Sequence, residues 1–355
     1  MKVRYLLLPF SFIFGLVTYI RRALYKKNIL ASGTAPVPAI SIGNLKVGGT
    51  GKTPHTEYLI SLLSEKYNIA VLSRGYGRKT KGYILANTLP GEQLTAVHLG
   101  DEPMQIFRKF PQIKLAVAEE RMTGVKNLLA EYPDLNAIIL DDAFQHLKFR
   151  ASLKIVLTEY RNPYTDDFPL PAGNLREFRH AADEADIIIV TKTKPDLTEK
   201  EKQLFLEKLK PKTSQECFFS CIEYSGIKPE NELASEHVIN PDDHVMLLTG
   251  IANPAPLKEY LSGKISCIKH IKFPDHHTFT ISDEEKIRKC IAGQDRTVMI
   301  TTEKDYIRLV SSPAKKIVSS YPVYTVPIKI KFLFGEEEKF NSIIENHVTK
   351  NPENS

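Results

Sequence analysis

Short apolar runs alternate with longer mixed stretches through the first half of the chain. The runs have the length of single buried strands, and the segments between them are long enough to hold helices. Buried strands that alternate with helices are typical of a mostly parallel sheet covered on both faces, so the pattern predicts an α/β fold. The runs are VPAISIGN from residue 37, IAVLSRG from 69, KLAVA from 114, NAIILDD from 136, LKIVLTE from 153 and DIIIVTK from 186.

A second set of apolar runs follows a predicted helix, TEKEKQLFLEKLK, at residues 198–210. These runs are CFFSCIEY, VMLLTG, ISCIKHI and TVMITTE, and they predict a second, smaller α/β domain. We therefore expect a core over residues 31–215, the smaller domain and linker over 216–330, and a C-terminal tail over 331–355 that frays after Phe334. The last strand-like run, YPVYTVPIKIKF, fits either the first domain or the linker.

The N-terminal segment is apolar from Leu6 to Ile20, with cations on both sides. It is shorter than the ~20 apolar residues that cross a membrane, and no small-residue cleavage site follows promptly, as it would in a signal peptide. A helix in the membrane interface and a helix buried in the core both fit the pattern. Because core packing does not require clustered cations, we expect residues 1–30 to form a membrane-associated helix. The cations are Lys2, Arg4, Arg21, Arg22, Lys26 and Lys27.

Composition and charge narrow the class of ligand. The chain has 355 residues and 42% hydrophobic content, which is enough for two domains with substantial cores. Its net charge of +6 fits an acidic ligand such as a nucleotide, a phospholipid or a phosphosugar. No Lys/Arg run is interleaved with aromatic residues, so no nucleic-acid partner is expected. The cysteines lack zinc or disulfide spacing and are expected to be free thiols: Cys217, Cys221, Cys267 and Cys290.

A glycine-rich segment between the first apolar run and an amphipathic stretch predicts a phosphate-binding loop. Glycines let backbone N–H groups approach phosphate oxygens, and the helix that follows adds the positive end of its dipole. In such loops the lysine reaches the terminal phosphates, and the hydroxyl residue after it binds Mg²⁺. The full motif would place glycine where this chain has Lys46. The predicted phosphate-binding residues are Gly48, Gly49, Thr50, Gly51, Lys52 and Thr53.

Carboxylates at strand ends predict the other half of a nucleotide site. Asp141 and Asp142 end the run NAIILDD, in the position of acids that hold Mg²⁺ beside a phosphate loop. Phosphoryl transfer to a hydroxyl also needs a group that accepts its proton. The candidates are Asp101 and Glu102 in HLGDEP and His276 in FPDHHTF, although each alone could be a turn cap or a surface residue.

Several segments of the chain together carry a family resemblance. They are ISIGNLKVGGTGKTP, SRGYGR, HLGDEPMQI, ILDDAFQH, PAGNLRE, IVTK, LTGIANP, FPDHHTF and TTEKD, in this order. The set resembles the tetraacyldisaccharide 4′-kinase family (lipid A 4′-kinases). The resemblance implies ATP and Mg²⁺ as cofactors, a lipid A disaccharide 1-phosphate as acceptor and its 1,4′-bisphosphate as product. It also implies a P-loop core joined to a smaller α/β domain, with an N-terminal helix on inner-membrane lipids at the cytoplasmic face.

The resemblance further implies roles for individual residues. Asp101 is similar to the general base of the family, assisted by His276 from the second domain, and Lys52 acts on the phosphates. A base pair drawn from two domains would make catalysis depend on domain closure, which also excludes water. The residues implied to organise metal and water are Thr53, Glu102, Asp141 and Asp142, and the residue implied to bind the substrate's anionic groups is Arg121.

Two departures from the family pattern and two rival functions bear on this interpretation. Ala143 stands where the family has glycine, which would strain a turn of positive φ, and Asn174 stands where proline is common. A membrane-tethered switch ATPase has a similar loop, but its additional lysine would stand at Val47, whereas Lys46 is one residue out of register. The other rival is a kinase for a different amphiphilic sugar or a soluble metabolite. A soluble acceptor gives no reason for a membrane helix, so the lipid A precursor is favoured.

Overall fold

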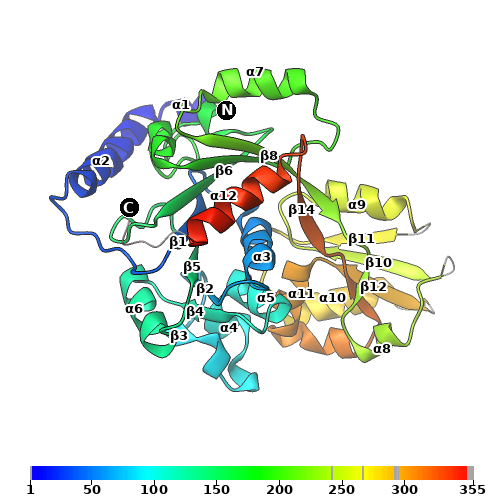
Figure 1. Ribbon diagram of the computed structural model, residues 1–355. Coiled ribbons are helices and arrows are strands. Elements are labelled where there is room, and N and C mark those ends of the chain that lie inside the picture. The colour runs from blue at the N-terminus through cyan, green and yellow to red at the C-terminus, as the bar shows by residue number, and fades with distance from the viewer. Residues whose placement is uncertain (1, 241–242, 266–267, 292–293, 295, 350–355) are drawn as a thin grey trace.

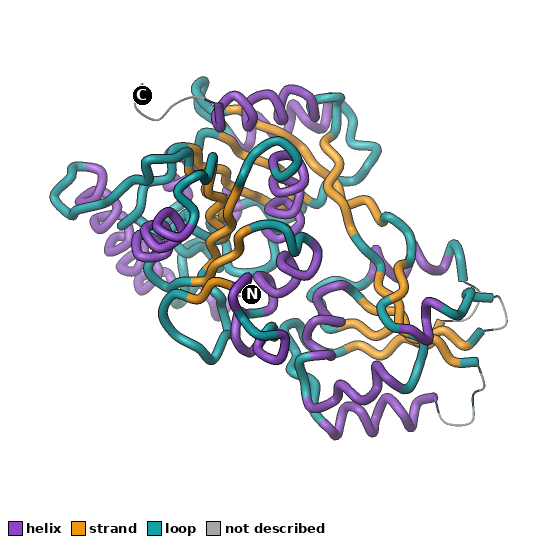
Figure 2. Tube along the Cα trace, turned by 60° about the horizontal axis from the view of Figure 1, so that its bottom comes forward, coloured by secondary structure: helices purple, strands orange, loops and turns teal. Residues whose placement is uncertain are grey.

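Two β-sheets, each with helices packed on it, divide the molecule into a larger and a smaller domain (Figure 1). The computed structural model describes residues 2–240, 243–265, 268–291, 294 and 296–349. In the rotated view of Figure 2 the smaller domain lies to one side of the larger one. This arrangement confirms the predicted α/β fold with a second, smaller α/β domain.

The larger sheet has the strand order β14-β8-β7-β6-β1-β5-β2-β4-β3. Neighbours from β8 to β4 pair in parallel, and the edge strands β14 and β3 are antiparallel. The central strands are buried on both faces, as their continuous apolar sequences require. The strands are β1 (Ala39–Asn44), β2 (Ile69–Ser73), β3 (Ile84–Leu85), β4 (Lys114–Val117), β5 (Ala137–Asp141), β6 (Leu153–Glu159), β7 (Ile187–Thr191), β8 (Glu216–Tyr224) and β14 (Ile328–Phe332).

Helices cover both faces of the larger sheet. Alternate strand residues such as Ile40 and Ile42 pack with α3, α5 and α12 on one face. The strand residues between them pack with α6 and α7 on the opposite face. The helices of this domain are α1 (Lys2–Tyr5), α2 (Leu8–Lys26), α3 (Lys52–Leu63), α4 (Ala96–Leu99), α5 (Asp101–Lys109), α6 (Arg121–Glu131), α7 (Glu199–Leu209) and α12 (Glu337–Thr349).

The smaller sheet has the order β11-β10-β12-β13-β9, parallel except for β9. Its strands are β9 (Lys228–Pro229), β10 (His244–Thr249), β11 (Ile268–Lys272), β12 (Thr297–Thr301) and β13 (Val323–Thr325). Its helices are α8 (Glu232–Ser235), α9 (Ala255–Ser262), α10 (Ile281–Ile291) and α11 (Glu303–Val310). Of the cysteines, Cys217, Cys221 and Cys290 are free thiols, and Cys267 lies outside the described residues.

The division between the domains differs from the sequence expectation. β8 pairs with β7, and β14 pairs with β8, so both strands belong to the larger sheet. The strands of the smaller sheet lie between Lys228 and Thr325, which makes this domain an insertion between β8 and β14 and not the whole of residues 216–330. Apolar runs of similar length occur in both sheets, so their pattern alone does not assign a strand to one of them.

The C-terminal segment is a packed helix for most of its length. In α12 the side chains of Phe340, Ile344 and Val348 are buried against the larger sheet. They recur at every fourth position and form one apolar stripe, a signal that the acidic composition obscured. The expected fraying after Phe334 is therefore wrong for α12, while residues 350–355 lie outside the described part of the chain.

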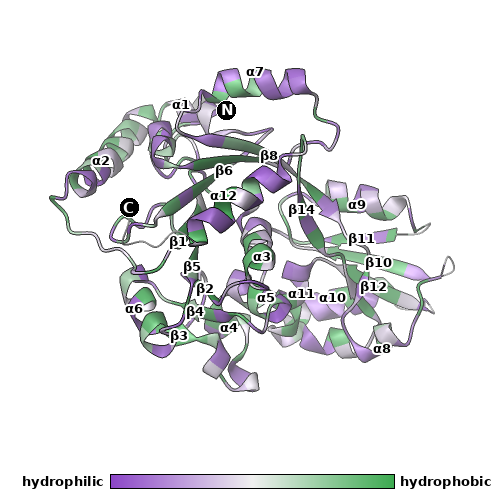
Figure 3. Ribbon diagram, in the orientation of Figure 1, coloured by the Kyte–Doolittle hydropathy of each residue, from purple (hydrophilic) through white to green (hydrophobic). Residues whose placement is uncertain are grey.

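The N-terminal helix α2 docks on the larger domain through a narrow face of small and polar residues. Gly15 lies against the ring of Phe178, and a Cβ at this glycine would come within 2.4 Å of that ring. Arg22 is buried and pairs with Glu177 at 2.7 Å. Much of α2 is hydrophobic (Figure 3). Its exposed hydrophobic residues include Phe10, Phe12, Ile13, Val17 and Ile20. Among the helices that the structure describes, none has both the length and the apolar character needed to cross a membrane.

Candidate active site

The segment between β1 and α3 forms an open loop at the start of the helix. Gly48 and Gly51 have φ values of +116° and +92°, which residues with a side chain rarely adopt. A Cβ at Gly48 or Gly49 would meet no atom within 4 Å, so space lies beyond both glycines. The N-cap of α3 makes no side-chain hydrogen bond, which leaves the helix N-terminus open to an anion.

Lys52, the first residue of α3, is directed toward the ends of two neighbouring strands. Its Nζ donates to Asn44 Oδ1 at 3.3 Å, at the end of β1. The same atom lies 3.7 Å from Asp142 Oδ1, beyond the end of β5. Thr53 follows in the first turn of α3 and is partly buried. The loop lysine, the hydroxyl residue and an acid of the predicted pair therefore come together as the sequence predicts.

A buried histidine fixes the end of the loop. His55 lies one turn into α3, where Nδ1 donates to the Gly51 carbonyl at 2.7 Å and Nε2 accepts from Ser220 Oγ at 2.9 Å. The carbonyl oxygen can only accept, which places the proton of the neutral ring on Nδ1. Burial lowers the pKa of His55 to about 4, so the ring is neutral at neutral pH. The loop is thus tied to β8 of the same sheet.

The two adjacent acids after β5 have different surroundings. Asp141 is buried, and its carboxylate accepts from Thr56 Oγ1 at 3.3 Å and from Ser73 Oγ at 3.1 Å. Burial, and then the neighbouring charge of Asp142, raise the pKa of Asp141 to about 6. Asp142 has a φ of +47° and accepts from Arg176 Nη1 at 3.1 Å. Because β5 lies beside β1, both acids stand at the sheet edge where the phosphate loop begins.

Asp101 and Glu102 begin α5, and both pair with α11 of the smaller domain. Arg308 Nε donates to Asp101 Oδ2 at 2.6 Å, and Lys304 Nζ donates to Glu102 Oε1 at 2.7 Å. Burial raises the pKa of Glu102, but the Lys304 ammonium outweighs it and holds that pKa below its ordinary value. Lys304 and Arg308 are one helical turn apart, so a single face of α11 meets both acids.

His276 lies in the loop after β11, in the left-handed backbone region with a φ of +58°. Its Nδ1 accepts from Arg308 Nη2 at 2.9 Å, and its backbone N–H donates to Asp275 Oδ1 at 3.0 Å. Burial, followed by the charges of Lys304 and Arg308, lowers the pKa of His276. Asp101 and His276, predicted as partners, thus meet on one guanidinium and come from different domains.

The phosphate side and the interdomain side of the site are close enough to act on each other's charges. Asp141 experiences the charges of Lys52 and Glu102, and Glu102 experiences the charge of His276. The loop, the acid pair and the acids at the start of α5 therefore converge on one region between the two domains. Arg121 also meets this region, because it donates to the carbonyl of Asp141 at 3.1 Å.

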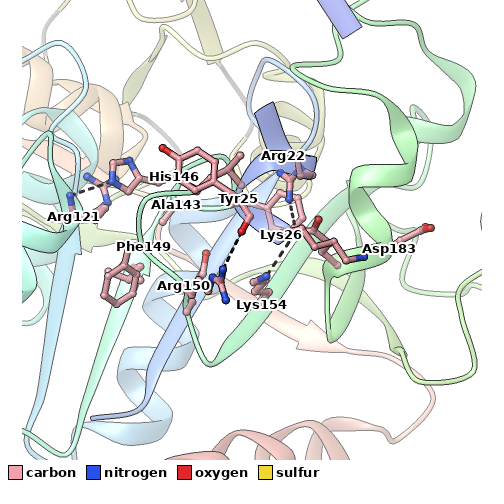
Figure 4. Close-up of a pocket in the computed structure, with 16 residues that line it drawn as sticks. Arg22, Tyr25, Lys26, Arg121, Ala143, His146, Phe149, Arg150, Lys154 and Asp183 are labelled. Carbon is pink, nitrogen blue, oxygen red and sulfur yellow. Dashed lines mark hydrogen bonds and ion pairs between the residues drawn. The ribbon is translucent and has the colours of Figure 1, made fainter. Parts of the chain in front are cut away.

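Arg121 lies deeper than the other candidates. It begins α6, is 2% exposed, and donates to the carbonyls of Ala118 at 2.6 Å and Asp141 at 3.1 Å. Burial lowers its pKa to about 10, and its Nε makes no hydrogen bond within the described residues. With Arg22 and His146 it lines a cavity of about 340 Å³ between α2 and the larger sheet (Figure 4). Arg121 therefore supports the backbone of the acid pair from the cavity side.

The departures from the family pattern are accommodated locally. The left-handed residue of the turn after β5 is Asp142, so Ala143 is free of the strain that a positive φ would impose. Asn174 donates from its backbone N–H and from Nδ2 to Asp167, both at 3.2 Å, and this ties its loop. Lys46 is buried and pairs with the same Asp167 at 2.7 Å. Its ammonium is therefore engaged away from the phosphate loop, unlike the additional lysine of a switch ATPase.

Several polar residues of the site were not among the sequence candidates. Each lies in a segment that carried the resemblance or within three residues of one, but nothing in those segments showed which side chains would meet. One chain of contacts runs from Arg176 to Gln145 Oε1 at 3.3 Å and from Gln145 to the Asn44 carbonyl at 2.7 Å. The residues that sequence reasoning missed are Asn44, Gln145, Arg176, Lys304 and Arg308.

Known proteins share this sequence and fold over nearly the full chain. The family described as Tetraacyldisaccharide-1-P 4′-kinase matches residues 3–349. Tetraacyldisaccharide 4′-kinase of Flavobacterium johnsoniae is 43% identical over 352 residues, with 99% of each chain covered. Its namesake in Bacteroides thetaiotaomicron is 40% identical, with 100% of this chain and 96% of that protein covered. The crystal structure of "apo" form LpxK from Aquifex aeolicus in complex with ATP has a TM-score of 0.73 at 28% identity, covering 98% of this chain and 99% of its own. These findings confirm the resemblance, and the chain belongs to the tetraacyldisaccharide-1-P 4′-kinase family.

Proposed function

We propose that this chain transfers the γ-phosphate of ATP to the 4′-hydroxyl of a tetraacyldisaccharide 1-phosphate, a step of lipid A biosynthesis that gives the 1,4′-bisphosphate. Family membership over nearly the whole chain supports the reaction, and the related structure with ATP supports the nucleotide. The observation that carries the proposal is the convergence of Lys52, the acid pair after β5 and the Asp101–His276 pair on one interdomain region.

The phosphate loop holds the nucleotide in this proposal. Backbone N–H groups from Gly48 to Gly51 and the N-terminus of α3 receive the phosphate oxygens. Lys52 neutralises the charge that grows on the β- and γ-phosphates during transfer. Because Asn44 already holds the Lys52 ammonium at 3.3 Å, the cation is positioned before the nucleotide binds.

Asp101 is the proposed general base. As the 4′-oxygen bonds to the γ-phosphorus and the bond to the leaving ADP oxygen breaks, the hydroxyl proton passes to the Asp101 carboxylate. Arg308 occupies Oδ2 of this carboxylate, and no other described side chain hydrogen-bonds to it, so Oδ1 is left for the hydroxyl. His276 assists as a neutral imidazole, the form that its lowered pKa favours.

The acids at the sheet edge fit Mg²⁺. No group of three or more His, Cys, Asp or Glu side chains within the described residues is arranged to hold a metal by itself. Mg²⁺ at nucleotide sites needs only one or two carboxylates beside phosphate oxygens and water. Burial, and then the neighbouring charge of Asp142, raise the pKa of Asp141, and a bound cation would offset this repulsion. Thr53, Asp141 and Asp142 would hold the ion, with Glu102 close by, and bound Mg²⁺ would neutralise the phosphates.

The exposed apolar face of α2 is proposed to lie in the interface of the inner membrane, on its cytoplasmic side. Phe10, Phe12 and Val17 are exposed on this helix. Arg21 and Lys26 near its C-terminal end would meet anionic head groups. The docked face with Gly15 keeps the helix on the enzyme while the opposite side meets lipid. A lipid acceptor held in the same surface would then reach the site without leaving the membrane.

Phosphate transfer provides the direct test. Wild type and Asp101→Ala are incubated with γ-labelled ATP and detergent-solubilised tetraacyldisaccharide 1-phosphate, and label in the lipid is measured. We expect acceptor-dependent product from wild type and its loss in the variant. ATP hydrolysis by wild type without labelled lipid would reject the kinase and favour the switch ATPase.

Vesicle binding tests the proposed role of α2. We expect wild type to bind vesicles that contain anionic lipid, and a Phe10→Asp/Val17→Asp variant to lose this binding.

A further inference from the structure

A buried arginine lies between the two members of the proposed base pair. Arg308 Nε donates to Asp101 Oδ2 at 2.6 Å, and Nη2 donates to His276 Nδ1 at 2.9 Å. Its third nitrogen, Nη1, donates to the Gly250 carbonyl at 3.0 Å. Asp101 belongs to the larger domain, and the other partners belong to the smaller one. One planar guanidinium therefore sets the position of both groups across the domain boundary.

Arg308 is itself held by a buried carboxylate. Asp305 is fully buried, and its Oδ1 accepts from Arg308 Nη1 at 3.3 Å. Its Oδ2 accepts from the Gly250 N–H and from Thr302 Oγ1, both at 2.8 Å. Asp305 thus joins two segments, LTG and TTEKD, that take no part in the proposed reaction. Burying a carboxylate is costly unless it is paired, so Asp305 is suited to hold the Arg308 guanidinium in place.

The contact with Arg308 determines which nitrogen of His276 carries the proton. A guanidinium can only donate, so Nδ1 is the acceptor and the neutral ring has its proton on Nε2. The side chain of His276 is 51% exposed, and its backbone has a φ of +58°. An exposed ring on a strained backbone needs an external restraint to keep one orientation. Within the described residues, Arg308 is the group that hydrogen-bonds to this ring.

We propose that Arg308 is a positioning residue that holds Asp101 and His276 as one unit across the domain boundary and keeps His276 in the Nε2–H tautomer. The inference rests on the proposed function, because it takes these two groups as the base pair. Arg308 makes no contact with the reacting atoms in this role. Lysine is a poor substitute, since a single ammonium on a flexible stem does not reproduce the planar fork that bridges the two partners.

The tautomer of His276 is measurable in the wild-type protein. Histidine labelled with ¹⁵N gives distinct signals for protonated and unprotonated ring nitrogens, and the His276 signals are identified by their loss in His276→Gln. We expect a protonated Nε2 and an unprotonated Nδ1 at neutral pH. A ring protonated on Nδ1, or an even mixture of tautomers, overturns the proposal. This measurement does not depend on whether any Arg308 variant folds.

Kinetics of Arg308→Gln and Arg308→Lys test the consequence for turnover. We expect kcat to fall by about 10–100-fold in Arg308→Gln, because the base pair loses its alignment, while the KM values for both substrates stay close to wild type. Arg308→Lys is expected to recover only part of the loss. The matched control is Arg288→Gln on α10, whose arginine pairs within its own helix with Glu284 at 2.9 Å and should leave kcat unchanged. Equal losses in kcat and in ATP affinity would indicate a merely structural role and overturn the proposal.

Double variants separate this inference from the proposed function. If Arg308 acts through the base pair, Arg308→Gln costs much less in a His276→Ala background than in wild type. Multiplicative losses, or a full kcat in Arg308→Gln, overturn the positioning role while leaving the kinase reaction intact. If Asp101→Ala and His276→Ala both retain full turnover, the proposed base pair itself fails.

Discussion

The phosphate loop (residues 48–53) and the base cluster (Asp101, His276 and Arg308) are built in opposite ways. The loop joins two consecutive elements, β1 and α3, and its supports Asn44, His55 and Thr191 all belong to the larger domain. The base cluster joins the start of α5 to a loop and a helix of the other domain. The loop is therefore complete within the larger domain, whereas the base pair exists only where the domains meet. This difference implies that nucleotide binding and phosphoryl transfer can be disrupted separately.

The largest effect is expected at the base cluster. Asp101→Asn removes the proposed proton acceptor, so we expect kcat to fall by about 10²–10⁴-fold. ATP affinity should stay at its wild-type value, because the loop does not depend on Asp101. Single-turnover transfer and calorimetric titration with ATP measure the two quantities. A comparable loss of ATP affinity would show that the two regions are not separable.

The converse change removes the loop lysine. Lys52→Gln loses a charge-assisted hydrogen bond to phosphate, and we expect ATP affinity to weaken by about 10–100-fold. The base cluster should be undisturbed, so the ¹⁵N signals of His276 should match those of wild type. Altered His276 signals in Lys52→Gln would show that a change in the phosphate loop disturbs the base cluster, and would contradict the prediction that the two regions are separable.

Two glycines, one in β1 and one in the loop after it, separate packing from ligand binding. A Cβ at Gly43 would lie 2.6 Å from Phe144 Cβ, so Gly43→Ala should lower the free energy of unfolding by about 1–3 kcal/mol. Gly49→Ala meets no atom within 4 Å and should change that free energy by less than about 0.5 kcal/mol. It should nevertheless weaken ATP binding, because the methyl group enters the space beside the phosphates. Urea denaturation with and without ATP tests both variants. If ATP stabilised Gly49→Ala as much as wild type, the predicted loss of ATP binding would be wrong.

The smallest effect concerns His146, which lines the cavity between α2 and the larger sheet. Burial, followed by the charge of Arg121, lowers the pKa of His146 from 6.5 to about 4. Between these two pKa values the unfolded chain binds a proton at His146 and the folded protein does not. The free energy of unfolding therefore falls as pH falls from about 6.5 to about 4. Because His146 is only partly buried, we expect about 1 kcal/mol of this loss between pH 7 and 5. His146→Gln should reduce the pH dependence measured by urea denaturation by this amount, while the contribution of the buried His55 remains.

The same contrast explains how far the sequence could predict the molecule. The strands near the phosphate loop were found because parallel strands buried on both faces have continuous apolar sequences. The loop was found because its residues are consecutive, from Gly48 to Thr53. Arg308 could not be found in this way, since its partners Asp101 and His276 are distant in sequence and meet it only in the fold. The pairing of Asp101 with His276 came from family resemblance, and the guanidinium between them came from the structure.

Two errors have a common physical origin. The helix α12 was assigned to a tail and the strand β8 to the smaller domain, because local composition does not reveal which sheet a segment completes. Phe340 is buried against Phe332 and Phe218 of the larger sheet, a contact between distant segments. The acidic residues at the start of α12 are favourable at a helix N-terminus. Without knowledge of the packing, however, they indicate an exposed and unstructured segment.

The insertion of the smaller domain between β8 and β14 has a consequence for synthesis on the ribosome. β8 stays an unpaired edge of the larger sheet until β14 emerges, after the whole insertion. α12, which closes one face of that sheet, emerges last. The strands of the smaller domain, from Lys228 to Thr325, are all present before then. The second domain along the chain can therefore finish folding before the first, and a nascent chain that stalls late exposes the nucleotide-binding half and not the insertion.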